Sequence, residues 1–195
     1  MKIMNVKSAY LLIVSSLFIV NSTAVQANFS DDSTYCSQAG GTVEDMPAIF
    51  HTRAGDVTGL TKSFCTFSVD HGHIVIGLEA FASDAPSLAA TYMKQLDEVT
   101  EDSPLWKGGF TNPSYNVCRN LGGTLIGFAT LGSFTSQRGE ADVCVFGDGS
   151  MVSAWSLIYM AAHREGYDDI KNQVKAEPLN IELKQAKAEI THQVD

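Results

Sequence analysis

The feature that most constrains this chain is a short pattern of cysteine and glycine that occurs twice. Each copy reads Cys-x-x-x-Gly-Gly-Thr-apolar and is followed further along the chain by Cys-x-Phe. The first copy begins at Cys36 and is completed at Cys65, and the second begins at Cys118 and is completed at Cys144. All four cysteines of the 195-residue chain fall in these copies, one pair in each. A repeated framework of this kind predicts architecture and covalent stabilisation rather than a particular reaction.

The N-terminal region has the layout of a secretory signal peptide. Lys2 and Lys7 precede an apolar run at 9–20, and Val25-Gln26-Ala27 has the small-residue pattern of a cleavage site. The apolar run is shorter than the roughly 20 residues that span a bilayer. We therefore expect cleavage after Ala27 and an exported protein, either periplasmic or secreted.

The mature chain is acidic, which limits its partners. The whole chain has a formal charge of -9, and residues 1–27 hold two lysines and no acidic residue, so cleavage leaves about -11. Binding to phosphate needs Lys and Arg, so we expect no nucleic-acid partner. We also expect no cofactor and no integral membrane segment after the signal is removed.

Export places the four thiols in an oxidising compartment, where paired cysteines usually form disulfides. Four cysteines allow three pairings, and the duplication favours Cys36 with Cys65 and Cys118 with Cys144. The pairs lack the close C-x₂₋₄-C spacing of structural zinc sites. No C-x-x-C redox motif occurs either. The cysteines are therefore predicted to stabilise the fold.

Each copy predicts a short helix followed by a small antiparallel meander, with the disulfide joining the helix to the second strand. In the second copy, Asn112 or Thr111 can cap a helix with Pro113 at its first position, and the glycine pair ends that helix. The β-branched and aromatic runs predict strands at 42–43, 64–69, 74–78, 124–128, 142–146 and 151–155. The predicted class is α+β, with two tandem modules that are either separate or merged into one sheet.

These elements divide the chain into five predicted segments. They are a signal peptide (1–27), a first repeat module (28–82), a helical linker (83–110), a second repeat module (111–160) and a C-terminal helical region (161–195). Apolar residues at helical spacing predict a helix within 87–100. The C-terminal region is expected to be interrupted near Gly166 and Pro178, with good helix formers at 181–190.

A further motif follows the second cysteine pair. The motif residues of this copy are Asn112-Pro113, Cys118, Gly122-Gly123, Cys144-Val145-Phe146-Gly147-Asp148-Gly149-Ser150 and Trp155. This set resembles a bacterial family of exported, hemolysin-like envelope domains of unknown function. The resemblance covers about residues 111–158. The first copy of the repeat, about residues 31–82, resembles a degenerate version of the same domain. It departs from the family where Gly147 replaces a proline and where two further cysteines are absent. The resemblance implies an envelope location and carries no residue-level mechanism.

The loops between the strands of each disulfide-bonded copy are the expected place for recognition of a partner. The best candidate is the Gly/Ser/Thr-rich segment 127–139, in which we single out four side chains, Phe128, Leu131, Phe134 and Arg138. Its counterpart in the first copy is 46–61, which is also expected to be a loop and which contains His51, Arg53 and Asp56.

One short motif has metal-binding character. His71-Gly72-His73 on a strand would place two imidazoles on one face, and a third ligand such as His51, Asp56 or Glu79 would have to arrive through folding. A polar hairpin tip is the interpretation that we favour, so no metal site is assigned. No arrangement in the sequence predicts a catalytic residue.

Two functional hypotheses follow. The first is a non-enzymatic exported binding protein, an envelope or secreted factor of the inhibitor kind, that binds an unidentified protein or envelope component. The alternative is a secreted hydrolase or toxin whose site is assembled in space, in one version with a metal at His71 and His73.

Overall fold

The computed structural model describes residues 29–70, 72–130 and 138–183. The predicted signal peptide lies outside the described residues, as do residues 184–195. The described elements, in chain order, are α1 (Phe29–Gln38), β1 (Thr42–Thr52), β2 (Gly55–Val69), β3 (Gly72–Gly77), α2 (Leu78–Ala82), α3 (Leu88–Gln95), α4 (Pro113–Asn120), β4 (Thr124–Ala129), β5 (Glu140–Val145), β6 (Met151–Ser153), α5 (Ala154–Ala161) and α6 (Tyr167–Lys171). This mixture confirms the predicted α+β class.

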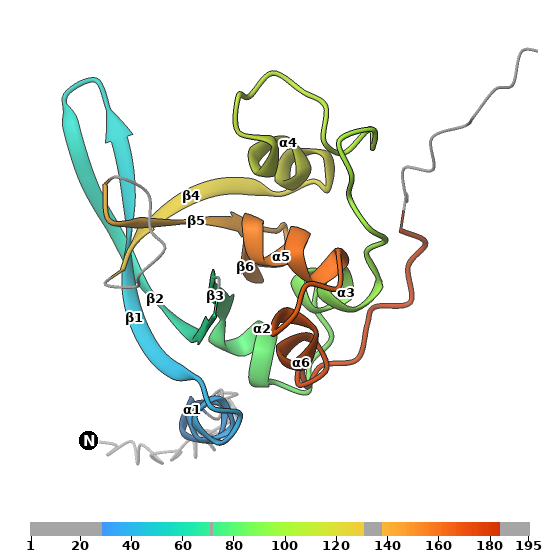
Figure 1. Ribbon diagram of the computed structural model, residues 1–195. Helices are drawn as coiled ribbons and strands as arrows, with labels where there is room; N and C mark the ends of the chain where they lie inside the picture. The colour runs from blue at the N-terminus through green and yellow to red at the C-terminus, as the bar shows by residue number, and fades with distance from the viewer. Residues whose placement is uncertain (1–28, 71, 131–137, 184–195) are drawn as a thin grey trace, which may run out of the picture.

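The strands form one closed barrel in the order β1-β2-β3-β6-β5-β4. Two pairings between the halves of the chain close it: Ile76 of β3 lies opposite Val152 of β6, and Ala48 of β1 lies opposite Phe128 of β4. Helices α2, α3, α5 and α6 gather on one side of the barrel, while the β1–β2 hairpin projects away from it (Figure 1). Strands from both halves therefore share one sheet.

The two halves use the same strand register around their cysteines. Val43 lies opposite Cys65 in the β1–β2 pair, and Leu125 lies opposite Cys144 in the β4–β5 pair. Each half also follows the same order of helix, three strands and helix. The repeated sequence pattern thus corresponds to a repeated local structure within the barrel.

The core has two parts that lie on opposite faces of the sheet. One fills the barrel with Met46, Ala48, Phe64, Val75, Phe128, Ala141 and Val143. The other lies between the sheet and the helices and contains all four cysteines. Inside the barrel, the rings of Phe64 and Phe128 meet edge to face at 4.9 Å, so an aromatic pair links the two halves.

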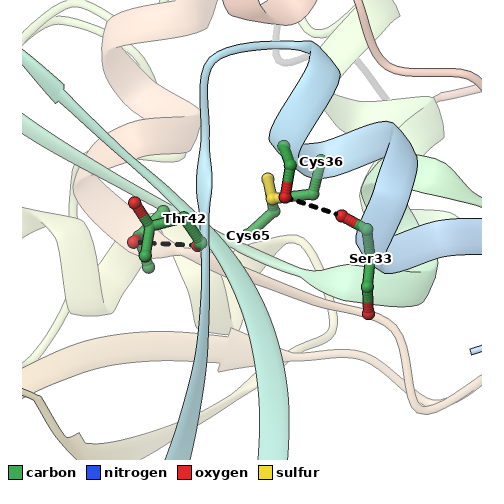
Figure 2. Close-up of a disulfide and its surroundings, with 6 residues drawn as sticks. Ser33, Cys36, Thr42 and Cys65 are labelled. Carbon is green, nitrogen blue, oxygen red and sulfur yellow. Dashed lines mark hydrogen bonds between the residues drawn. A yellow bond between two sulfur atoms is a disulfide. The ribbon is translucent and has the colours of Figure 1, made fainter. Parts of the chain in front are cut away.

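Each half has one disulfide between its first helix and its second strand. Cys36 of α1 is bonded to Cys65 of β2, and Cys118 of α4 is bonded to Cys144 of β5, with no free cysteine. These are the pairs that the duplication favours. Figure 2 shows the first bridge, with Cys36 on the helix above the strand that carries Cys65. In the chain-entropy account, loops of 26 to 29 residues contribute about 3–4 kcal/mol each.

The two glycines of the repeated motif have different roles. The first, Gly40 or Gly122, has a φ of 84° or 85° and ends its helix in the left-handed conformation that glycine adopts without strain. The second, Gly41 or Gly123, lies against the disulfide of its own half. A Cβ on Gly41 would lie 2.6 Å from the Cys65 Sγ, and a Cβ on Gly123 would collide with the Cys144 Sγ. The first glycine is therefore required by the end of the helix and the second by the bridge.

The Asp-Gly-Ser turn of the second half caps a helix between the halves. The Asp148 carboxylate accepts a hydrogen bond from the backbone N–H of Leu88 at 2.7 Å, and the Ser150 hydroxyl accepts one from the N–H of Ala89 at 2.9 Å. Ser87, the N-cap of α3, accepts a third from Ala90. These are N–H groups that the first turn of a helix cannot satisfy internally. The turn therefore joins the second half to α3.

The local signal at the start of α4 is confirmed, but two extents are wrong. Asn112 caps α4 with Pro113 in its first turn, as predicted. The segment 46–61, expected to be a loop, instead forms most of a long hairpin, in which Phe50 pairs with Val57. The strand expected at 151–155 ends at Ser153, and the buried run that follows forms α5. The C-terminal region contains only the short helix α6 among its described residues.

The close packing of Gly123 leads to a test of the glycine role. Gly123→Ala should lower the free energy of unfolding of the oxidised mature protein by about 1–3 kcal/mol, because the added methyl group overlaps the disulfide. Gly147→Ala is the matched control, since its Cβ meets no atom within 4 Å and its effect should stay within about 0.5 kcal/mol. Urea denaturation measures both, and equal effects would contradict the assignment.

Candidate functional site

A groove of about 540 Å³ lies on the outer face of the barrel where β1, β4 and β5 meet. The start of α4 forms one wall, and residues 49–51 of β1, close to the turn of the β1–β2 hairpin, form another. The residues that line it are Ile49, Phe50, His51, Tyr115, Leu125, Ile126, Gly127, Arg138, Glu140 and Asp142. Apolar groups thus surround a small set of charged and polar side chains, the composition typical of binding sites.

His51 lies between two carboxylates and links the hairpin to β5. Its Nδ1 is 2.7 Å from an Asp56 oxygen, and its Nε2 is 3.0 Å from a Glu140 oxygen. The hydrogen bond with Asp56, and then that with Glu140, raises the pKa of the His51 ring. When both nitrogens donate, the ring is an imidazolium held in place at both ends, so it has no free nitrogen to act as a base.

Glu140 is the buried member of this group, and a glycine makes room for it. Its side chain is only 10 % exposed. On the neighbouring strand, a Cβ at Gly127 would lie 2.6 Å from the Glu140 Oε2. Any larger residue at 127 would push the carboxylate away from His51. The position of the negative charge therefore depends on the backbone of β4.

Tyr115 and Asp142 form the second polar pair of the groove. Burial raises the pKa of the Tyr115 hydroxyl to about 12, and its hydrogen bond with Asp142 adds to this effect. Burial also raises the pKa of the Asp142 carboxyl, while the hydrogen bond from Tyr115 opposes that rise and the charge of Glu140 supports it. The Tyr115 hydroxyl is thus kept protonated and donates to Asp142.

Only the second half of the repeat has the tyrosine–aspartate pair. The equivalent strand pairs are Gly127 with Asp142 in the second half and Asp45 with Ser63 in the first. There the Ser63 hydroxyl donates to Asp45 at 2.6 Å. Ser33 occupies the position three residues before the helix cysteine, where the second half has Tyr115. The shared scaffold therefore has different chemistry on its two sides.

The groove suits recognition by fixed charges. Glu140 and Asp142 alternate with Ala141 and Val143, so both acidic side chains leave β5 on its outer face. Their carboxylates can accept hydrogen bonds from a cationic or amide-bearing ligand. Because their partners already hold them, little ordering of these side chains is needed on binding.

The four predicted recognition residues have different positions. Arg138 lines the groove, while Leu131 and Phe134 lie outside the described residues. Phe128 is only 2 % exposed and packs inside the barrel against Phe64. Its assignment as a recognition residue is therefore corrected: the alternation of β4 turns it inward.

The metal motif gains no support among the described residues. His71 lies outside them, and His73 is on the same face of β3 as the interior residue Val75. Neither ring nitrogen of His73 has a hydrogen-bond partner, and burial lowers its pKa, opposed by the Glu44 carboxylate and the Phe67 backbone. In the described ranges, no three His, Cys, Asp or Glu residues are grouped for a metal ion.

Sequence reasoning missed three polar residues of the groove, Tyr115, Glu140 and Asp142. A signal for the acidic pair was present, because Glu140-Ala141-Asp142-Val143 alternates between charged and apolar side chains. His51 was noted only as a possible metal ligand, and its actual partner Glu140 is 89 residues away in the sequence.

Comparison with protein-family models, curated proteins and solved structures finds no match to this chain. Within the part of the chain that the structure describes, no helix combines the length and apolar character needed to cross a bilayer.

The doubly bonded His51 leads to a pH-dependent prediction. Because the folded-state pKa of His51 is raised, its stabilising contribution is complete below its unfolded pKa of about 6.5 and is lost as the pH rises through the folded pKa. His51→Gln should therefore lower the free energy of unfolding more at about pH 6 than at about pH 9. Urea unfolding across this range measures the difference.

The control for this prediction is the Asp56→Asn variant. Asp56 makes the largest contribution to the shift, so the NMR titration midpoint of the His51 ring should fall in that variant. A wild-type ring that titrates at the ordinary histidine value would show that this arrangement does not form in solution.

Proposed function

We propose that this chain is an exported, non-enzymatic binding protein whose recognition site is the groove that β1 of the first half forms with α4, β4 and β5 of the second. The observation that supports this most is the contrast between two equivalent halves. Both have the disulfide and the glycine pair, and a second groove beside β2 is lined by Asp32, Lys62 and Ser63, but of these two grooves only the one beside β5 holds a histidine bonded to two carboxylates. The two halves act as tandem modules of one scaffold, and the groove is the part adapted to a partner.

The partner in this proposal is a protein or envelope component that presents a cationic side chain. Glu140 and Asp142 would accept its hydrogen bonds, and the apolar stem would lie along Ile49 and Tyr115, which line the same groove. Such a contact uses the acidic character of the chain, whose formal charge is -9. This recognition needs no cofactor and no nucleic acid.

The location in this proposal is the periplasm or the extracellular medium. The two disulfides are consistent with an exported protein, and the signal-peptide pattern at 1–27 predicts the route. The resemblance to hemolysin-like envelope domains agrees with this location. An inhibitor-like role fits a scaffold held rigid by disulfides, because binding to a rigid site costs little conformational entropy.

A secreted hydrolase is the second candidate, and the acidic pair favours it specifically. Glu140 and Asp142 face one groove, and the pKa of Asp142 is raised, which suits a general acid beside a charged carboxylate. His51 would act only as a positioning residue, because both its nitrogens are occupied. Cleavage of a glycan by the wild type, lost in Asp142→Asn, would establish this alternative over the binding role.

The binding proposal is tested with a matched pair of small probes. N-acetyl-lysine methylamide should shift the backbone NMR signals of Gly127 and Glu140, whereas the uncharged norleucine analogue should not. The Glu140→Gln, Asp142→Asn double variant should weaken lysine-probe binding at least about tenfold, because it removes two acceptor charges.

The control is Asp45→Asn, which changes the acidic residue of the equivalent strand pair in the first half. It should leave probe binding unchanged. The proposed site is wrong if the lysine probe shifts the signals of neither Gly127 nor Glu140. It is also wrong if Asp45→Asn weakens probe binding as much as the double variant does.

A further inference from the structure

The outer part of β2 has a free strand edge. Residues 55–63 pair with β1 on one side only, and the pairing of β2 with β3 begins at Phe64. No other described strand lies along this edge. The hairpin that carries it projects from the barrel (Figure 1). An edge of this length presents a row of backbone donors and acceptors that can pair with another strand.

This edge has the apolar side chains of an interface. Leu60 is 79 % exposed and Val57 is 53 % exposed, the two highest values among the large apolar residues described as exposed. Gly59 lies between them and leaves room for the ring of Phe50, since a Cβ there would be 2.5 Å from the Phe50 Cε2. Natural sheets usually protect such edges with charges, prolines or bulges; here Asp56 and Lys62 are the two charges on the edge, and the register of the strand pair shifts opposite Gly59 and Leu60.

The charge of the hairpin differs from that of the rest of the chain. Asp45 lies opposite Ser63 in the hairpin, and residues 45–63 contain Arg53 and Lys62 with Asp45 and Asp56, a formal charge of zero in a chain of -9. Two copies of an acidic protein repel each other over most of their surface, and the hairpin is a place where that repulsion is weak. An antiparallel pairing of two β2 edges would also bring the Asp56 end of each strand beside the Lys62 end of the other.

We propose that the β2 edge pairs antiparallel with the same edge of a second copy of this chain, forming a two-fold dimer. Residues 55–63 of the two copies then continue one sheet, and Val57 and Leu60 of each copy are covered by the other. Such an interface is isologous, since the same patch serves both subunits. It uses a different strand edge from the groove, so this inference is independent of the proposed function.

The interface is small, so the dimer is weak and depends on concentration. Interfaces at the low end of the size range are typical of transient complexes. Sedimentation velocity of the mature chain should show monomer at low concentration and dimer at higher concentration. Leu60→Lys should raise the dimer dissociation constant more than about tenfold, because it places a charge at the centre of each contact. Ile181→Lys is the control, since Ile181 is also exposed and lies outside the hairpin, and it should dimerise normally.

A charge swap tests the antiparallel arrangement. Lys62→Asp places two acidic strand ends together and Asp56→Lys places two basic ends together, so each variant should weaken the dimer about threefold to tenfold through its two symmetric contacts. The double variant, Asp56→Lys with Lys62→Asp, should restore dimerisation. A parallel pairing would show no such rescue.

Three results would overturn the proposal. They are a chain that stays monomeric at millimolar concentration, a dimer that Leu60→Lys leaves unchanged, and a double variant no better than the single ones. The first would indicate that a strand from a different protein covers the edge. Circular dichroism of each variant shows whether it is folded, so a lost dimer can be distinguished from a lost fold.

Discussion

Closure of the barrel is the interaction on which the rest of this structure depends. The two halves meet at Ile76 with Val152 and at Ala48 with Phe128. A three-stranded sheet from one half alone would have two unpaired edges and one open face. Closure removes those edges along the body of the barrel and allows Phe128 to reach Phe64 across its interior. Each small half therefore buries an apolar face that it could not cover alone.

Sequence patterns predicted the parts of this structure that short-range chemistry determines. The cap at Asn112 and the glycine pair after each helix are local signals, and the structure contains both. Closure was not predictable, because it joins strands far apart in the sequence through a few residue pairs. The hairpin arm was missed because Pro47 and Gly59 interrupt its strand pattern. The groove was missed because it also joins residues far apart in the sequence. The alternation of charged and apolar residues places Glu140 on the outer face of β5, but nothing local indicates that His51 will contact it.

The second disulfide links the scaffold to the groove. Tyr115 precedes Cys118 by three residues on α4, about 4.5 Å along the helix axis. Asp142 precedes Cys144 by two residues on β5, about 6.6 Å along the strand. A bridge at one end of this helix–strand pair therefore holds the Tyr115 hydroxyl near the Asp142 carboxylate at the other. Glu140 lies two residues further from the bridge. There the neighbouring element is the hairpin rather than the helix, and His51 of the hairpin contacts Glu140.

The equivalent helix–strand pair in the first half has the disulfide but no counterpart of the hydrogen bond between Tyr115 and Asp142. Its equivalent positions hold Ser33 and Ser63, and the nearby carboxylate of Asp45 is occupied by the Ser63 hydroxyl. Neither serine can span the distance that a tyrosine ring covers, so no buried polar pair forms between helix and strand there. Because the cysteines and glycines fix the backbone in both halves, the outward positions beside them are free to differ. A repeat of this kind can therefore keep the same bridges and glycines in both halves while the side chains that line its two grooves differ.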